Sequence, residues 1–146
     1  MDTIDCSILN ALKENGRTTA SEISKRVNLS IPAVTERIRK LEEANIIEAY
    51  TIKISREKMG CNLLSFIFVT IDQSKHIEDF RKAIVACKSV LECHHVAGQY
   101  DYLLKVIVAD TQELEHFISH TLKNMIGVHS SNTIISLSSL KENINL

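Results

Sequence analysis

Residues 19–44, TASEISKRVNLSIPAVTERIRKLEEA, have the pattern of two short helices joined by a tight break. Thr19 and Glu22 have the spacing of a capping box, in which the hydroxyl and the carboxylate each accept a hydrogen bond from a free backbone N–H. After the break, Ser30 can cap a second helix, and Pro32 lies in its first turn, where no N–H is needed. This arrangement predicts a helix-turn-helix, whose second helix lies in the DNA major groove.

The second helix has an apolar face and a polar, basic face. Apolar residues recur at the helical period: Ile31, Val34, Ile38 and Leu41. Residues 25–40 contain five basic residues and one acidic residue, a net charge of +4, although the whole chain has a formal charge of −1. Charge alone is compatible with ordinary solvated helices. The caps, the break and the apolar face together favour DNA binding.

The two helices suggest which side chains would contact DNA. Basic side chains mostly contact phosphates, whereas the first turns of a recognition helix approach the base edges. We therefore expect a DNA-binding surface of ten residues: Lys25, Arg26, Ser30, Pro32, Ala33, Thr35, Glu36, Arg37, Arg39 and Lys40.

Length and composition indicate a soluble globular protein of one ordinary domain or two small ones. The chain has 146 residues, of which 45% are apolar and 24% charged. No apolar run reaches the ~18–20 residues of a membrane helix, and the first residues, MDTIDCSILN, do not resemble a signal peptide. We expect no membrane association and a cytoplasmic location. The four cysteines lack C-x-x-C spacing, so free thiols are expected.

The elements around the helix-turn-helix define a first domain and a connector. Residues 2–15 form an expected first helix that stops at Gly16, and Asn45 is expected in a left-handed cap after the recognition helix. Residues 46–54, IIEAYTIKI, are rich in β-branched residues and predict a strand. The predicted organisation is a DNA-binding domain at 1–45, a linker strand and connector at 46–60, and a second domain at 61–146.

The second domain predicts strands and helices in the order βαββαβ. The expected elements are a strand at 63–71, a helix at 76–88, strands at 90–97 and 100–109, a helix from Asp110 to Gly127, and a strand at 128–140. The inner face of the last helix is expected to carry Leu114, Phe117, Ile118, Thr121 and Met125. This order is that of a ferredoxin-like fold, and the whole chain is predicted to be α+β.

The first strand of this domain is apolar on both alternating faces. Leu64, Phe66 and Phe68 lie on one face, and Ile67, Val69 and Ile71 on the other. A strand with two apolar faces must be covered on both. The two helices cover one face, so a homodimer made through the second face is expected.

The whole chain resembles the Lrp/AsnC, or feast/famine, transcription regulators. The resemblance is carried by DTIDCSILNALKENGR, NLSIPAVTERIRKLEEANII, YTIKISREKMG, VAGQYDYLLKV and MIGVHSSNTIISLSSLKE. The family's hairpin pattern, Gly-x-aromatic-Asp-aromatic-leucine, is met by residues 98–103. Asn45 departs from the glycine that the family commonly has there, and asparagine tolerates the same left-handed conformation.

The resemblance implies a sequence-specific regulator that binds double-stranded DNA and often responds to an amino acid. It also implies that the second domain, RAM-type in this family, forms dimers and larger rings, commonly of four dimers, on the nucleoid. The effector would lie between dimers near the hairpin, at Gly98, Gln99, Tyr100 and Asp101. No other cofactor is implied.

Three alternatives remain open at this point. Gly98 and Asp101 could be only turn or interface residues, with a DNA-binding or architectural regulator that needs no effector. The helix-turn-helix could be merely structural in a small-molecule-binding protein. An enzyme would need an acid–base group such as His94, His95 or Asp101, but no Gly-rich phosphate loop or oriented nucleophile is present.

Cysteine and histidine cluster in the second domain without a metal-binding motif. Cys93, His94 and His95 are consecutive, and His116 and His120 lie four residues apart in a predicted helix. Consecutive strand residues point to opposite faces, and no H-E-x-x-H motif is present. We therefore predict no metal site and no catalytic residues.

Overall fold

The structure, a computed structural model, describes residues 1–143. The described chain divides into two compact units, residues 1–54 with Asn143 and residues 55–142, whereas the sequence suggested a boundary at Gly60. Residues 55–60 belong with the second unit, where Arg56 Nη2 donates to Ser139 Oγ at 3.1 Å. The last three residues of the expected second domain lie outside the described residues.

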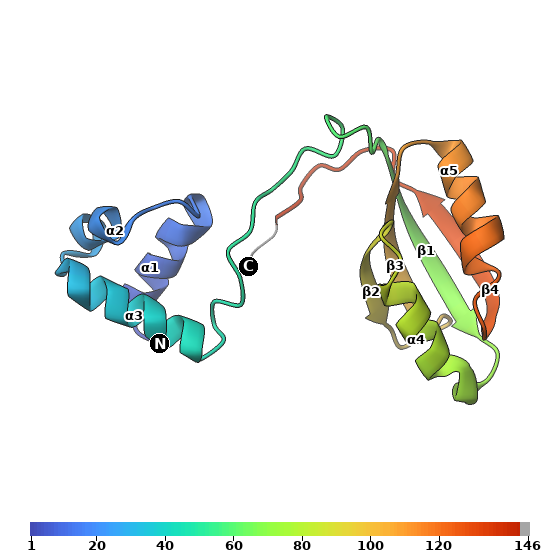
Figure 1. The fold of residues 1–146 in the computed structure, drawn as a ribbon, viewed down its shortest axis with the longest axis horizontal. Coiled ribbons are helices and arrows are strands. Elements are labelled where there is room, and N and C mark those ends of the chain that lie inside the picture. Colours follow the sequence, from blue (N-terminus) through green and yellow to red (C-terminus); the bar gives the residue numbers. More distant parts are fainter. Residues whose placement is uncertain (144–146) are drawn as a thin grey trace. The chain divides into compact units, whose positions relative to one another are not determined.

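Three helices form the first unit: α1 (Thr3–Glu14), α2 (Ala20–Val27) and α3 (Ile31–Glu43) (Figure 1). Their core consists of Ile8, Ala11, Ile23, Val34 and Leu41. The capping box of α2 is confirmed, since Thr19 Oγ1 accepts from the Glu22 N–H and Glu22 accepts from the Thr19 N–H. Ser30 caps α3 as expected, by accepting from the Ala33 N–H at 3.4 Å.

Left-handed residues mark two of the helix ends. Asn28 follows α2 with φ 52°, and Asn45 follows α3 with φ 53°, which confirms the expected left-handed cap. Gly16 follows the C-cap residue of α1, at the position expected for the stop, but without the left-handed conformation that is common there. α1 ends at the extended residue Asn15, whose N–H bonds to the Ala11 carbonyl, and Gly16 has no positive φ.

Residues 46–54 do not form the predicted strand. The N–H groups of Ile46 and Ile47 bond instead to the Leu41 carbonyl at the end of α3. Tyr50 donates its hydroxyl to Glu42 at 2.8 Å, and partial burial together with this carboxylate raises the pKa of Tyr50 to about 12. The segment therefore bonds to α3 rather than to another strand.

The second unit is a four-stranded antiparallel sheet in the order β2-β3-β1-β4, with α4 and α5 on one face (Figure 1). The strands are β1 (Leu63–Ile71), β2 (Val90–His95), β3 (Tyr102–Val108) and β4 (Val128–Ile135). A 3₁₀ turn (Ser74–His76) precedes α4 (Ile77–Val85), and α5 (Thr111–His116) continues as a π-helix (Phe117–Leu122). The predicted ferredoxin-like order is confirmed.

Several elements are shorter than expected. β4 stops at Ile135, opposite Ser65, and one further hydrogen bond joins the Ser136 N–H to the Leu64 carbonyl of β1 at 2.9 Å. β2 and β3 are separated by residues 96–101, where the Val96 N–H bonds to the Asp101 carbonyl and the Asp101 N–H bonds to the Val69 carbonyl of β1. The helix expected at 76–88 ends at Val85.

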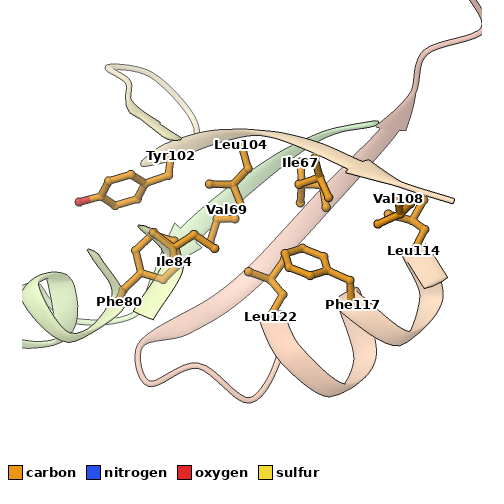
Figure 2. Close-up of a cluster of buried hydrophobic side chains, with 11 residues drawn as sticks. Ile67, Val69, Phe80, Ile84, Tyr102, Leu104, Val108, Leu114, Phe117 and Leu122 are labelled. Atoms are coloured by element: carbon orange, nitrogen blue, oxygen red, sulfur yellow. The ribbon is translucent and has the colours of Figure 1, made fainter. Parts of the chain in front are cut away.

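The core of this unit lies between the sheet and its two helices (Figure 2). β3 alternates buried and half-buried residues along its length, as expected for a strand with one face on the core. The buried side chains, from β1, β3, α4, α5 and the π-helix, are Ile67, Val69, Phe80, Ile84, Tyr102, Leu104, Val106, Val108, Leu114, Phe117 and Leu122.

The π-helix changes which residues reach the core. The Lys123 N–H bonds to the Ile118 carbonyl, five residues back, so each turn here contains an extra residue. Leu122 is fully buried, while Thr121, which the sequence placed on the inner face, is only half-buried. Ile118 and Met125 of the same expected face are half-buried too, and the buried residue that the sequence did not predict is Leu122.

The other face of the sheet, which we call the open face, carries apolar side chains without a helix above them. Phe66 is paired with Ile134, and Phe68 with Leu103, so these four residues share that face. Ile134 is 51% exposed. Within residues 1–143, no helix is long and apolar enough to cross a membrane.

Candidate functional site

The recognition helix α3 presents a polar surface, and its apolar face lies in the core of the first unit except for Ile31, which is 47% exposed. Val34 and Leu41 are buried. Eight of the ten expected DNA-binding residues are exposed: Lys25, Arg26, Ser30, Pro32, Thr35, Glu36, Arg39 and Lys40. The other two, Ala33 and Arg37, are half-buried.

The exposed cations of this surface contact nearby carboxylates. Arg39 donates to Glu36 at 2.7 Å and also to Glu43, and the hydrogen bond to Glu36 raises the pKa of Arg39. Lys40 lies 3.8 Å from the same Glu36. Exposed ion pairs of this kind contribute little to stability, so the cations can exchange these partners for phosphates.

Arg37 has a different environment from its neighbours on α3. Its Nη1 donates to Asp2 Oδ2 at 2.8 Å and to Asp5 Oδ1 at 2.7 Å. The pKa of Asp2 is held below its ordinary value by the Asp5 N–H and by Arg37. Sequence analysis did not identify these two aspartates. Their N-cap-to-N3 spacing, the same as that of Thr19 and Glu22, is the signal that could have identified them.

A shallow depression of about 410 Å³ lies between α1 and α2. Lys25 and Arg26 line it together with the carboxylates of Glu14 and Glu22. Arg26 bonds to Glu14 at 2.7 Å. The depression is therefore of mixed charge.

The expected effector residues are consecutive in the hairpin between β2 and β3, but their side chains have different environments. Gly98 has φ +152°, a conformation that side-chain-bearing residues rarely adopt, and both Gly98 and Gln99 are exposed. The Tyr100 ring packs against Phe68, with centroids 4.9 Å apart. Asp101 Oδ2 accepts from the Ile71 N–H at 2.7 Å, so one carboxylate oxygen fastens the hairpin to β1.

The cysteine and histidine residues do not converge. His94 contacts Glu92 at 3.2 Å, whereas His95 stacks on Tyr102 with centroids 5.0 Å apart. Burial raises the pKa of the Cys93 thiol. His116 and His120 stack on each other, 4.7 Å between centroids. Across residues 1–143, no three Cys, His, Asp or Glu side chains form a group that could hold a metal ion.

Both halves of the chain match family models. Residues 1–48 match a winged helix-turn-helix DNA-binding domain, and residues 64–146 match the Lrp/AsnC ligand binding domain.

The same likeness extends to individual relatives. The chain is 35% identical to the leucine-responsive regulatory protein of Haemophilus influenzae, over 97% of this chain and 87% of that protein. It is 34% identical to that of Escherichia coli, over 97% and 88%.

Solved structures of known regulators have the same fold. A transcriptional regulator of Neisseria meningitidis, solved as a complex with L-Met, superposes with a TM-score of 0.96 at 34% identity, covering 100% of this chain and 96% of that one. Escherichia coli AsnC superposes with a TM-score of 0.92 at 25% identity, covering 97% and 95%. The helix-turn-helix, the ferredoxin-like unit and these matches over nearly the whole chain show that it belongs to the Lrp/AsnC family of DNA-binding transcriptional regulators.

Proposed function

We propose that this protein recognises specific DNA sequences through α3 and that an amino acid, or a related metabolite, bound between dimers modulates it. The observation that carries the DNA-binding part is the two-sided character of α3. Val34 and Leu41 are in the core, whereas Thr35, Glu36, Arg39 and Lys40 are exposed at a surface that matches a DNA-binding family model. Such a regulator would act in the cytoplasm, on the nucleoid.

The residues of this surface have two proposed roles. The first turns of α3 approach base edges, where the start of a recognition helix is positioned to contact bases. That group consists of Ser30, Pro32, Ala33, Thr35 and Glu36. The exposed cations Lys25, Arg26, Arg39 and Lys40 contact phosphates, which fix the position of the protein on the duplex without selecting sequence.

Salt dependence tests the DNA-binding part. The logarithm of the binding constant should fall by about 0.9 for each phosphate contact per decade of salt. Lys40→Ala should weaken binding to all sequences and reduce that slope by about 1, measured by fluorescence anisotropy over a salt series. Lys123→Ala, which changes an exposed lysine of the second unit, is the matched control and should leave the slope unchanged. A salt-independent affinity of the wild-type protein would contradict the proposal.

The effector part depends on the hairpin and on the relatives. One set of relatives is named leucine-responsive regulatory protein, and one structural neighbour was solved as a complex with L-Met. The exposed backbone at Gly98 and the carboxylate of Asp101 provide acceptors for an α-amino group, and a second subunit would be needed to enclose it.

Titration with the twenty amino acids, by calorimetry and by size-exclusion chromatography, tests the effector part. Binding of one amino acid with a change in assembly size is expected, and Gly98→Ala should weaken it because the added methyl group disfavours φ +152°. The control is Gly60→Ala, whose glycine also has a positive φ but lies outside the hairpin.

One observation favours a regulator that needs no effector. Asp101 already has a structural partner in the Ile71 N–H, which is sufficient to explain a carboxylate at this position. If no amino acid binds and DNA is still bound, this second candidate is correct. If an amino acid binds and no DNA does, the helix-turn-helix is structural.

The proposed assembly is a homodimer through the open face of the sheet, with four dimers in a ring. The dimer is supported by the apolar residues of that face, Phe66, Phe68, Leu103 and Ile134, which no helix within residues 1–143 covers. The ring rests on family resemblance. Sedimentation velocity at several protein concentrations distinguishes dimers from octamers.

A further inference from the structure

Arg37, Asp2 and Asp5 form a cluster that we call the Arg37 clamp. Each aspartate divides its two carboxylate oxygens between two tasks. Asp2 Oδ1 accepts from the Asp5 N–H and Asp5 Oδ2 accepts from the Asp2 N–H, which closes the capping box of α1. The remaining oxygen of each carboxylate accepts from Arg37 Nη1. The cap of α1 and the middle of α3 are therefore joined through the same two side chains.

The environment of Arg37 does not suit a phosphate contact. Its side chain is 31% exposed, compared with 51% for Arg39 and 67% for Lys40. Two carboxylates and one guanidinium carry a net charge of −1, which repels a phosphate. The pKa of Arg37 is raised by its hydrogen bonds to Asp2 and Asp5, so the cation is held by this pair.

The clamp restricts the orientation of α3 against α1, which apolar packing alone does not fix. Val34 and Leu41 bury α3 in the core, but apolar contacts are non-directional and permit small rotations of one helix on another. Charge-assisted hydrogen bonds from one guanidinium nitrogen to two carboxylates fix orientation more closely. Side chains that bind a ligand work best when the element carrying them is held within about 0.5 Å of its productive position.

We propose that Arg37 is a positioning residue, which fixes the orientation of the recognition helix against α1 and does not itself hold a phosphate. This inference rests on the proposed DNA binding through α3. It assigns to Asp2 and Asp5, two acidic residues, a favourable role in binding a polyanion.

The test is Asp2→Asn, because it separates the clamp from simple electrostatics. Asparagine is as good an N-cap as aspartate, so the capping oxygen is kept while the acceptor for Arg37 becomes an amide NH₂. The variant removes one negative charge from the DNA-binding unit, and electrostatics alone predicts tighter binding. The clamp predicts weaker binding, by roughly 3–10-fold, as expected when one charge-assisted hydrogen bond is partly lost.

The probes are a short duplex selected by the wild-type protein from a random-sequence pool and an unselected duplex of equal length. Loss of helix orientation should reduce affinity for the selected duplex more than for the unselected one, whereas loss of a phosphate contact weakens both alike. Arg37→Ala should leave the salt slope unchanged, in contrast to Lys40→Ala. Adding Asp2→Asn to Arg37→Ala should have little further effect, since the two residues act through one contact.

Glu14→Gln is the matched control, because it also removes a negative charge from this unit but breaks only the exposed pair with Arg26. Its DNA affinity should stay the same or rise. Circular dichroism melts of every variant, with binding measured below the onset of unfolding, exclude a contribution from unfolded protein.

Tighter binding by Asp2→Asn, or a salt slope reduced by about 1 in Arg37→Ala, would overturn the clamp. These results are distinguishable from failure of the proposed function. If the wild-type protein bound neither duplex, DNA recognition itself would be refuted. If the wild-type protein and Lys40→Ala behaved as proposed while the aspartate variant bound more tightly, only the inference would fail.

Discussion

Gly127 and Gly60 both have positive φ angles, +90° and +79°, but only Gly127 has a neighbour where a side chain would lie. A Cβ at Gly127 would come within 2.4 Å of the His76 Cβ, whereas a Cβ at Gly60 would meet nothing within 4 Å. We expect Gly60→Ala to lower the free energy of unfolding by about 1 kcal/mol through backbone strain. Gly127→Ala should cost a further 1–3 kcal/mol or so from overpacking. Urea unfolding of both variants checks this, and equal losses would contradict it.

At the scale of single residues, the sequence predicted best those contacts that are made within one turn. Thr19 with Glu22, Ser30 and Asn45 follow rules that need only three or four neighbouring residues, and all three occur as expected. Arg37 is 32 residues from Asp5 and 35 from Asp2. The apolar periodicity of the sequence cannot predict such an ion pair, because the pair forms only when α1 and α3 pack together.

At the scale of elements, the π-helix after α5 makes a specific prediction about Leu122 and Thr121. Leu122→Ala should reduce the free energy of unfolding by about 2–5 kcal/mol, because it empties a fully buried site. Thr121→Ala should change it by less than about 1 kcal/mol, since Thr121 is only half-buried. Thermal or urea unfolding of the pair provides the measurement. Similar losses of unfolding free energy in both variants would indicate that residues 117–122 form a regular α-helix instead of a π-helix.

Helices were easier to predict than strands for a physical reason. A helix satisfies its backbone internally, so caps and apolar spacing within α2 and α3 were sufficient to locate them. A strand needs a partner, and the β-branched composition of residues 46–54 does not supply one. Among the described residues, that segment bonds to Leu41 and Glu42 of α3 instead.

At the scale of the whole molecule, the open face of the sheet predicts how assembly can be disrupted. Ile134→Asp would place a carboxylate among the apolar residues of that face, and burying an unpaired charge costs several kcal/mol. The dissociation constant of the dimer should therefore rise by about 100-fold or more, measured by analytical ultracentrifugation. Val85→Asp introduces the same change on α4, which covers the opposite face, and should leave assembly unchanged. Equal effects of the two would contradict an interface on the open face.

The central position of β1 has a consequence for how the chain acquires its structure during synthesis. β1 is the first strand of the sheet to be made, yet one of its two neighbours, β4, is the last. At ~5–20 residues per second, translation of the intervening chain takes on the order of several seconds. Throughout that time an apolar strand has an unpaired edge, while the three helices of the first unit, all of whose residues have been synthesised, can already fold. We therefore expect the nascent second unit to be more prone to aggregation during synthesis than the first unit.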